Sequence, residues 1–162
     1  MPAVQDLSVV VTSKRSGQNE SADMTPEDAY HELCCYTLAH RDPAFIHQHV
    51  VDAFAAQNAT GATKPITLTF ALVGLHLHLE KQFSGKQVQR THQQLARVKR
   101  AWPVFPLPRD RGSMTAVDVM TRPAGPERDR AIHHWCASVW DAYRDSQPAV
   151  AGLLEKTGAR KV

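Results

Sequence analysis

After residue 24, hydrophobic residues recur every three to four positions along most of the chain, the spacing typical of one face of an α-helix. Helix starts are marked as well. Thr25-Pro26-Glu27-Asp28 places an N-cap hydroxyl, a proline and two acids in order, and Asp42-Pro43 and Thr63-Lys64-Pro65 repeat this signal. Ser84 with Gln87 forms a capping box. The pattern predicts helices over about Pro26–His40, Pro43–Asn58, Pro65–Gln82 and 84–101.

The stretch from Trp102 to Gly125 contains four prolines, so it predicts a long structured loop, in which Thr115 and Asp118 are placed to cap one short helix. Pro126 opens a further helix, and a last short helix covers about Pro148–Lys156. Strand patterns are nearly absent. The helix over Pro65–Gln82 is apolar on almost every side, which is typical of a central helix. We therefore predict an all-α fold, a compact five- or six-helix bundle with a central hydrophobic helix and a long Pro-rich loop.

The first 24 residues differ in composition from the rest of the chain. Ser, Asn, Gly, Gln and charged residues surround one β-branched run, Leu7–Thr12, so we predict a flexible N-terminal tail at 1–24 that donates one edge strand or none. Residues 25–162 are predicted to form a single helical domain. With 162 residues, 43% of them hydrophobic, the chain can bury a core without disulfides or a structural metal.

Composition also predicts where the protein resides. The longest hydrophobic stretch, Ile66–Leu79, is interrupted by polar residues and is shorter than the roughly 18–20 residues that cross a bilayer. The N-terminus lacks the pattern of a secretory signal. Three cysteines, two of them adjacent, fit no disulfide framework and suit a reducing compartment. We expect a soluble cytoplasmic protein without a membrane partner.

Polar side chains on the predicted central helix are the strongest candidates for chemistry. His76 and Glu80 lie one turn apart there, and His47 borders the apolar face of the preceding helix. We predict His47, His76 and Glu80 as general acid–base residues, and these three with His31 as ligands of zinc, iron or copper. The alternative is a buried histidine that is hydrogen-bonded to Glu80 and has no chemical role. The strong metal-ligand spacings, such as H-E-x-x-H and C-x-x-C, are absent from the sequence.

Charge is unevenly distributed. Residues 81–111 contain eight Lys and Arg against Asp110 alone, a net charge of +7, although the whole chain carries only +3. Such a basic helix can follow the phosphates of a nucleic acid or bind an acidic protein; the alternative is a solvated basic face.

Two kinds of function follow from these patterns. The leading hypothesis is a His- and Glu-lined site for an unknown small molecule or metal between helices, closed by the Trp102–Gly125 loop. The other is a non-enzymatic binding protein that uses residues 81–111 for nucleic acid or an acidic protein partner. Because common nucleophile and nucleotide-binding motifs are absent from the sequence, no reaction is predicted, and whether the protein is an enzyme stays open.

Three groups of residues together resemble a family of small, uncharacterised bacterial helical proteins, one of the families of unknown function. They are Tyr30-His31-Glu32-Leu33 with His47-Gln48, Val51-Asp52-Ala53-Phe54 and Gln57; Arg111-Gly112 with Thr115 and Asp118-Val119; and Trp135 with Ser138-Val139-Trp140. The resemblance implies a helical fold and a bacterial source, and it carries no established activity. It directs attention to His47 and to six candidate binding residues: Asp52, Gln57, Arg111, Thr115, Asp118 and Trp140.

Overall fold

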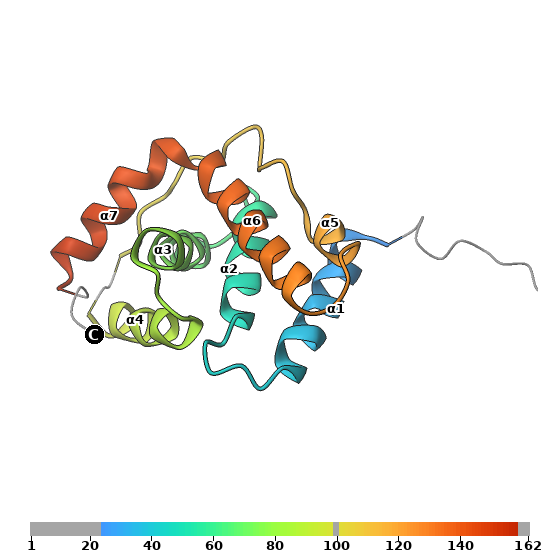
Figure 1. The fold of residues 1–162 in the computed structure, drawn as a ribbon. Coiled ribbons are helices and arrows are strands. Elements are labelled where there is room, and N and C mark those ends of the chain that lie inside the picture. The colour runs from blue at the N-terminus through green and yellow to red at the C-terminus, as the bar shows by residue number, and fades with distance from the viewer. Residues whose placement is uncertain (1–23, 99–100, 159–162) are drawn as a thin grey trace, which may run out of the picture.

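The computed structural model describes residues 24–98 and 101–158, and throughout these residues the regular structure is helical (Figure 1). The elements are α1 (Pro26–Ala39), α2 (His47–Gln57), α3 (Pro65–Lys81), α4 (Gly85–Val98), α5 (Ala116–Met120), α6 (Pro126–Ala142), the 3₁₀ helix η1 (Arg144–Ser146) and α7 (Gln147–Lys156). The predicted all-α class is confirmed. The described residues contain seven α-helices, more than the five or six expected, because the one-turn α5 adds to the six longer ones. Apart from Met24, the predicted tail lies outside the described residues.

Three of the predicted capping signals are confirmed, whereas α3 begins after Lys64 without a side-chain cap. The Thr25 hydroxyl accepts the N–H of Asp28 at 3.1 Å, and the Asp28 carboxylate accepts the Thr25 N–H in return. Thr115 and Asp118 form the same reciprocal pair at the start of α5. At the start of α4, the Ser84 N–H donates to Gln87 Oε1 at 2.8 Å. Local hydrogen bonding between neighbours therefore sets these three helix starts.

The expected start of α2 at Pro43 is wrong, because the helix begins four residues later at His47. The Asp42 carboxylate accepts the N–H of Ala44 at 2.8 Å and of Ile46 at 3.3 Å, which holds this stretch in a turn. Phe45 adopts a φ of 56°, a left-handed conformation that interrupts a right-handed helix. The Asp-Pro signal therefore marks a turn that leads into the helix.

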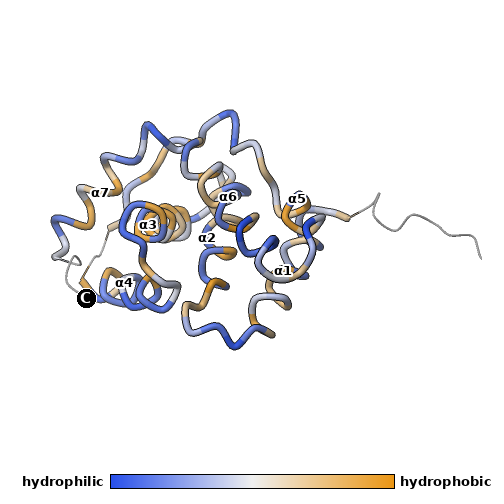
Figure 2. Tube along the Cα trace, viewed as in Figure 1, coloured by the Kyte–Doolittle hydropathy of each residue, from blue (hydrophilic) through white to orange (hydrophobic). Residues whose placement is uncertain are grey.

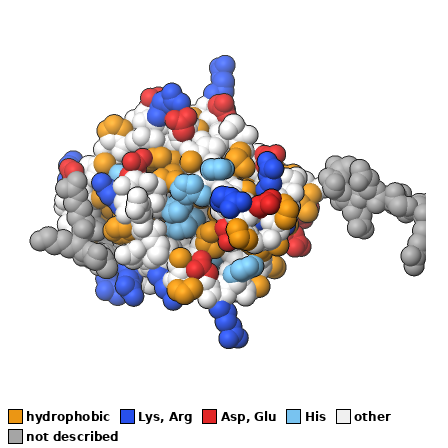
Figure 3. Space-filling view, viewed as in Figure 1, with side chains coloured by type: hydrophobic (Ala, Val, Ile, Leu, Met, Phe, Trp, Pro, Cys, Tyr) orange, Lys and Arg blue, Asp and Glu red, His pale blue; other side chains and the backbone are white. Residues whose placement is uncertain are grey.

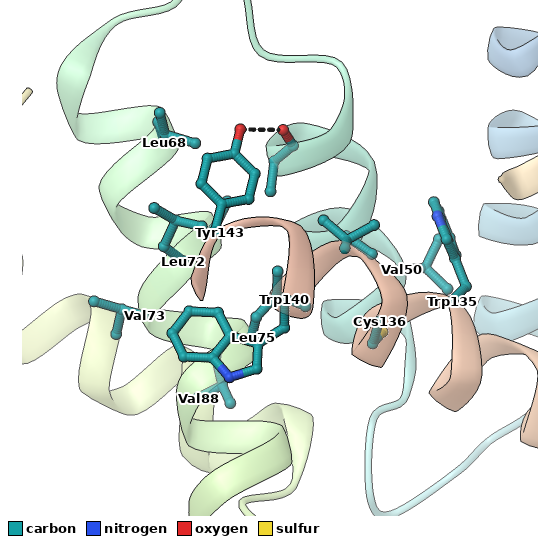
Figure 4. Close-up of a cluster of buried hydrophobic side chains, with 14 of the residues drawn as sticks. Val50, Leu68, Leu72, Val73, Leu75, Val88, Trp135, Cys136, Trp140 and Tyr143 are labelled. Carbon is teal, nitrogen blue, oxygen red and sulfur yellow. Dashed lines mark hydrogen bonds between the residues drawn. The ribbon is translucent and has the colours of Figure 1, made fainter. Parts of the chain in front are cut away.

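Helix α3 has the central position that its apolar sequence predicts. It contacts α2, α4, α6 and α7 (Figure 1), and the hydropathy colouring shows apolar turns in the helix behind a hydrophilic end (Figure 2). Its leucines lie near Trp140 and Tyr143 in the core (Figure 4), where Trp135 is fully buried beside Val50 of α2 and Tyr143 donates its hydroxyl proton to the Ala56 carbonyl at 2.7 Å. Helix α6 therefore joins the core around α3 to α2.

Helices α2 and α3 approach most closely where Asp52 faces Gly74. A Cβ atom added at Gly74 would overlap the Asp52 carboxylate. Asp52 is buried; its Oδ1 accepts a hydrogen bond from Gln48 Nε2 at 3.0 Å, whereas Oδ2 has no partner among the described residues. Burial raises the pKa of Asp52 well above that of an ordinary carboxyl. The side chain therefore favours its neutral acid form.

Among the described residues, no helix combines the length and the apolar character that crossing a membrane requires.

Candidate functional site

Three histidines from three helices meet at one place on the surface. The rings of His49 on α2 and His78 on α3 stack with centroids 3.6 Å apart and planes inclined by 18°. The His133 ring on α6 stands nearly perpendicular to the His78 ring, and His133 Nδ1 lies 3.3 Å from His78 Nε2. Figure 3 shows histidine side chains gathered near the middle of the face in view. The packing of these helices thus brings together three imidazoles that are far apart in sequence.

The three rings line a groove, which we call the histidine groove, with a volume of about 630 Å³. The turn before α2, the end of α3, the connection from α3 to α4 and the first turn of α4 form its other walls. These walls contribute Asp42, Ala44, Ile46, Leu79, Gln82, Phe83, Ser84 and Gln87. The groove therefore combines an apolar surface with a small number of hydrogen-bonding groups, as ligand sites in proteins commonly do.

The imidazoles of His49 and His78 are held in the neutral form. Burial, with the nearby His78 and His133, lowers the pKa of His49 to about 3. Burial and His133 lower the pKa of His78 to about 4, opposed in part by a hydrogen bond to the Phe83 backbone. A neutral imidazole offers one N–H donor and one lone pair, so these two rings can bind a polar group or a cation at neutral pH.

One polar atom at the groove is unsatisfied. His49 is 4% exposed, and its Nδ1 is buried without a hydrogen-bond partner among the described residues. A buried polar atom left unpaired costs about 1–3 kcal/mol, and such atoms are uncommon in folded proteins. This cost singles out His49 among the residues that line the groove.

The predicted acid–base residues of α3 face α6 and do not line the histidine groove. Trp140 Nε1 donates to Glu80 Oε1 at 3.1 Å, and the His76 ring lies 5.7 Å from the Trp140 ring. His76 is 8% exposed, whereas Glu80 is exposed. These residues thus share Trp140 as a neighbour, and their catalytic role stays a prediction.

The other two predicted metal ligands lie elsewhere. His47, in the first turn of α2, faces α1, where its Nδ1 is 2.9 Å from the Thr37 hydroxyl. His31 is exposed on α1 beside Tyr30. Among the residues described, no group of three or more His, Cys, Asp or Glu side chains is arranged to hold a metal ion. The predicted centre of His31, His47, His76 and Glu80 is therefore not assembled in this structure.

Gln57 and Arg111 fasten the long loop to the end of α2. Gln57 Nε2 donates to the carbonyls of Arg111 and Met114, while Gln57 Oε1 accepts from Trp135 Nε1 at 2.9 Å. The Arg111 guanidinium donates to the carbonyls of Gln57 at 3.3 Å and Ala59 at 2.7 Å, at the end of α2 where carbonyls lack helical partners. Both side chains are thus engaged within the protein, and a ligand-binding role for them stays a prediction.

Replacing Arg111 with alanine is expected to lower the free energy of unfolding by about 2–3 kcal/mol. The reason is the loss of the charge-assisted hydrogen bonds from its guanidinium to the carbonyl groups at the end of α2. The measurement is urea unfolding followed by circular dichroism. Arg109→Ala is the matched control: this exposed arginine lies two residues away in the same loop, and its loss is expected to change stability by less than about 0.5 kcal/mol. Equal effects of the two substitutions would contradict the anchoring role.

The remaining predicted binding residues also have partners inside the protein. Thr115 and Asp118 cap α5, Trp140 donates to Glu80, and Asp52 packs against Gly74. None of them lines the histidine groove. These contacts account for the residue types at these positions without a ligand, and binding by any of them stays a prediction.

The sequence patterns did not single out His49, His78 or His133 as site residues. The signal for His49 was present, since it sits beside the buried Val50 on α2. Nothing in the local pattern marks His133, which is exposed and is followed by a second histidine. Its relation to the other two depends on how α6 crosses α2 and α3.

Comparison with known proteins gives a family and no activity. No curated protein and no solved structure is similar enough to this chain to give a match. The model of DUF5946, described as a family of unknown function, matches residues 19–144, a stretch that contains all three groups of residues on which the resemblance was based. The chain belongs to the DUF5946 family of unknown function.

Proposed function

We propose that this protein binds a small organic molecule in the histidine groove, with the polar group of the ligand hydrogen-bonded to neutral imidazoles. The observation that carries the proposal is the meeting of His49, His78 and His133, from three helices, at one groove. Imidazole rings on an open, solvated surface are not expected to stack, whereas a ligand site concentrates its few polar groups in one hollow.

The lining indicates the chemistry of the ligand. Ile46, Leu79 and Phe83 offer an apolar wall, and the imidazoles, Ser84 and Gln87 offer uncharged hydrogen-bonding groups. Asp42 is the one acidic residue of the lining, and its carboxylate is engaged with the N–H groups of Ala44 and Ile46. We therefore expect an uncharged ligand with a hydrogen-bonding head and an apolar body.

The test uses small aromatic amides and alcohols, such as benzamide and benzyl alcohol, added to the full chain in the presence of EDTA. Saturable shifts are expected in the NMR signals of the His49 and His78 rings and of the Ile46 and Leu79 methyl groups. His49→Phe keeps an aromatic ring against His78 but removes both nitrogens, so it is expected to weaken binding at least about fivefold, the loss of roughly one hydrogen bond.

His92→Phe is the matched control. His92 is likewise buried, and it stacks on Phe70 with ring centroids 4.7 Å apart, but it lies on α4 away from the groove. Its replacement is expected to leave the affinity for the same compounds unchanged. Shifts confined to other parts of the protein, or equal losses in both variants, would reject the proposal.

Helix α4 supports a second candidate function, the binding of nucleic acid. Lys86, Arg90 and Arg97 are exposed at positions that share one face of the helix, opposite its buried Val88 and Leu95. We call these three cations the α4 basic stripe. Helix α4 contains no acidic residue, and no ion pair joins the stripe to an acidic side chain of the described residues. The charge is thus available to phosphates.

Binding of a fluorescein-labelled DNA duplex, followed by fluorescence polarisation, tests this function. Three phosphate contacts predict a slope of about −2.7 in log K against log salt, so the affinity should fall about 40-fold between roughly 50 and 200 mM salt. Neutralising the stripe (K86Q, R90Q and R97Q together) should abolish most of the binding. The control, K64Q, R122Q and R130Q together, removes the same charge from exposed positions outside α4 and should retain most of it. Equal losses in the two triple variants would indicate attraction by net charge alone.

Both candidate functions suit a bacterial cytoplasmic protein, the setting that the family resemblance and the cysteine content support.

A further inference from the structure

We infer that helix α4 holds a single-stranded nucleic acid, one base of which stacks on Trp102 in a second groove, between the start of the long loop and α7. This inference rests on the second candidate function, because it uses the α4 basic stripe to hold the phosphates. It is independent of the histidine groove and of any ligand bound there.

The second groove, which we call the tryptophan groove, has a volume of about 570 Å³. Its walls are Ala101, Trp102, Pro103 and Phe105 of the loop, and Pro148, Ala149, Gly152, Leu153 and Lys156 of α7. A Cβ atom added at Gly152 would have no neighbour within 4 Å, so the α7 wall is open at this position. The groove therefore offers a mostly apolar space for a flat ring between the loop and α7.

Trp102 differs from the other two tryptophans of the chain. It is half-buried, whereas Trp135 and Trp140 are buried in the core. Its ring meets the Phe70 ring of α3 at an angle of 86°, with centroids 5.1 Å apart, and no ring of the described residues stacks face to face on it. Phe70 itself is stacked on His92 of α4. The indole is thus positioned by a fixed neighbour, and a nucleobase has the flat face needed to stack on it.

Positive charge flanks the tryptophan groove on both sides. Lys156 is exposed and is the one charged side chain among the described residues that line the groove. On the loop side, Arg97 ends the α4 basic stripe four residues before Ala101, so their Cα atoms lie at most about 15 Å apart. No ion pair joins Arg97 or Lys156 to an acidic side chain of the described residues. Phosphates bound along the stripe therefore lead toward the groove.

The form of the nucleic acid follows from this combination. Proteins that bind single strands join a positively charged track for the backbone to aromatic side chains on which bases stack. An intact duplex keeps its bases paired and stacked on one another, so it can contact the stripe but has no free base for Trp102. A single strand can use both features.

Fluorescence polarisation with three labelled probes and the full chain tests the inference. The probes are an oligothymidine of about 12 nucleotides, an abasic strand with the same number of phosphates, and a duplex of the same length. We expect the oligothymidine to bind at least about fivefold more tightly than the abasic strand, the contribution of one stacked base. Its binding should also quench tryptophan emission, because Trp102 is the accessible indole.

Two variants examine the groove itself. Trp102→Leu should remove the quenching and the preference for oligothymidine over the abasic strand, and should change duplex binding less than about twofold. Gly152→Leu fills the groove from α7 without touching Trp102's contact with Phe70, so it should have the same effect on the preference even if Trp102→Leu does not fold. Gly61→Leu is the matched control, since a Cβ there also has no neighbour within 4 Å and Gly61 lies between α2 and α3, outside the groove.

The outcomes separate this inference from the second candidate function. Equal affinities for the oligothymidine and the abasic strand, or equal effects of Gly152→Leu and Gly61→Leu, would overturn the stacking site. Duplex binding that depends on the α4 basic stripe would leave the candidate function standing in that case. Failure of all three probes to bind would reject both.

Discussion

Replacing Gly74 with alanine is expected to lower the free energy of unfolding by about 3 kcal/mol or more. The new methyl group would overlap the Asp52 carboxylate, which is buried between α2 and α3 and cannot turn out into water. Overpacking of a core costs about 1–3 kcal/mol and occasionally more. The direction of this change in stability is informative. At a helix position with open space around it, replacing glycine with alanine raises the free energy of unfolding by up to about 1 kcal/mol. Urea unfolding measures the change.

Gly152 provides the matched control for Gly74. It lies within α7, and a Cβ added there would have no neighbour within 4 Å. Gly152→Ala is therefore expected to raise stability slightly. Asp52→Ala, combined with Gly74→Ala, removes the overlapping carboxylate and should recover part of the loss, so the two effects should not add. Stability of Gly74→Ala equal to that of the wild type would show that α2 and α3 do not approach as described.

Acidification from about pH 7 to pH 5 is expected to lower the free energy of unfolding. Burial lowers the pKa of His92 to about 4, as it lowers those of His49 and His78 to about 3 and about 4. The unfolded chain, with ordinary histidine pKa values of about 6.5, binds more protons than the folded one in this range. Stability from these groups is therefore complete above about pH 6.5 and is lost as the pH falls toward 4.

Asp52 changes the stability of the fold with pH in the opposite direction to the buried histidines. Its raised pKa means that the folded protein keeps a proton that the unfolded chain releases above about pH 3.8, so this group destabilises the fold as the pH rises. Asp52→Asn removes that opposing contribution. The three histidines alone account for a loss of about 5 kcal/mol between pH 7 and pH 5, so the variant should lose more stability over this range than the wild type does. Urea midpoints that do not change between pH 7 and pH 5 in either protein would contradict the burial of these histidines as neutral groups.

Local signals predicted most of the helices because the interactions that start a helix lie within a few residues. The capping pairs at Thr25, Ser84 and Thr115 connect neighbours in sequence, and each forms as expected. The start of α2 was misplaced because Asp42 can cap a turn as well as a helix, and nothing in the sequence shows that Phe45 adopts a left-handed conformation. A short turn is thus harder to predict from the sequence than a long helix with periodic hydrophobic residues.

For the candidate site, the sequence indicates the type of residue but not which residues meet. The sequence indicates histidines at the edges of apolar faces, which is where His49 lies. Which of them meet depends on the rotation and crossing of α2, α3 and α6, and this arrangement is decided by packing across the whole core. The pair chosen from helical spacing, His76 and Glu80, lies on the side of α3 that faces Trp140.

Long-range ¹H–¹⁵N spectra of the histidine rings test the central claim, that His49, His78 and His133 meet as one cluster in which the buried rings are neutral. At about pH 5.5, where a histidine with an ordinary pKa of about 6.5 is mostly charged, His49 and His78 should remain neutral. His78 should show one tautomer, and nuclear Overhauser effects should connect its ring to that of His49, whose centroid is 3.6 Å away. Charged, tautomerically mixed rings without contact between them would contradict the account.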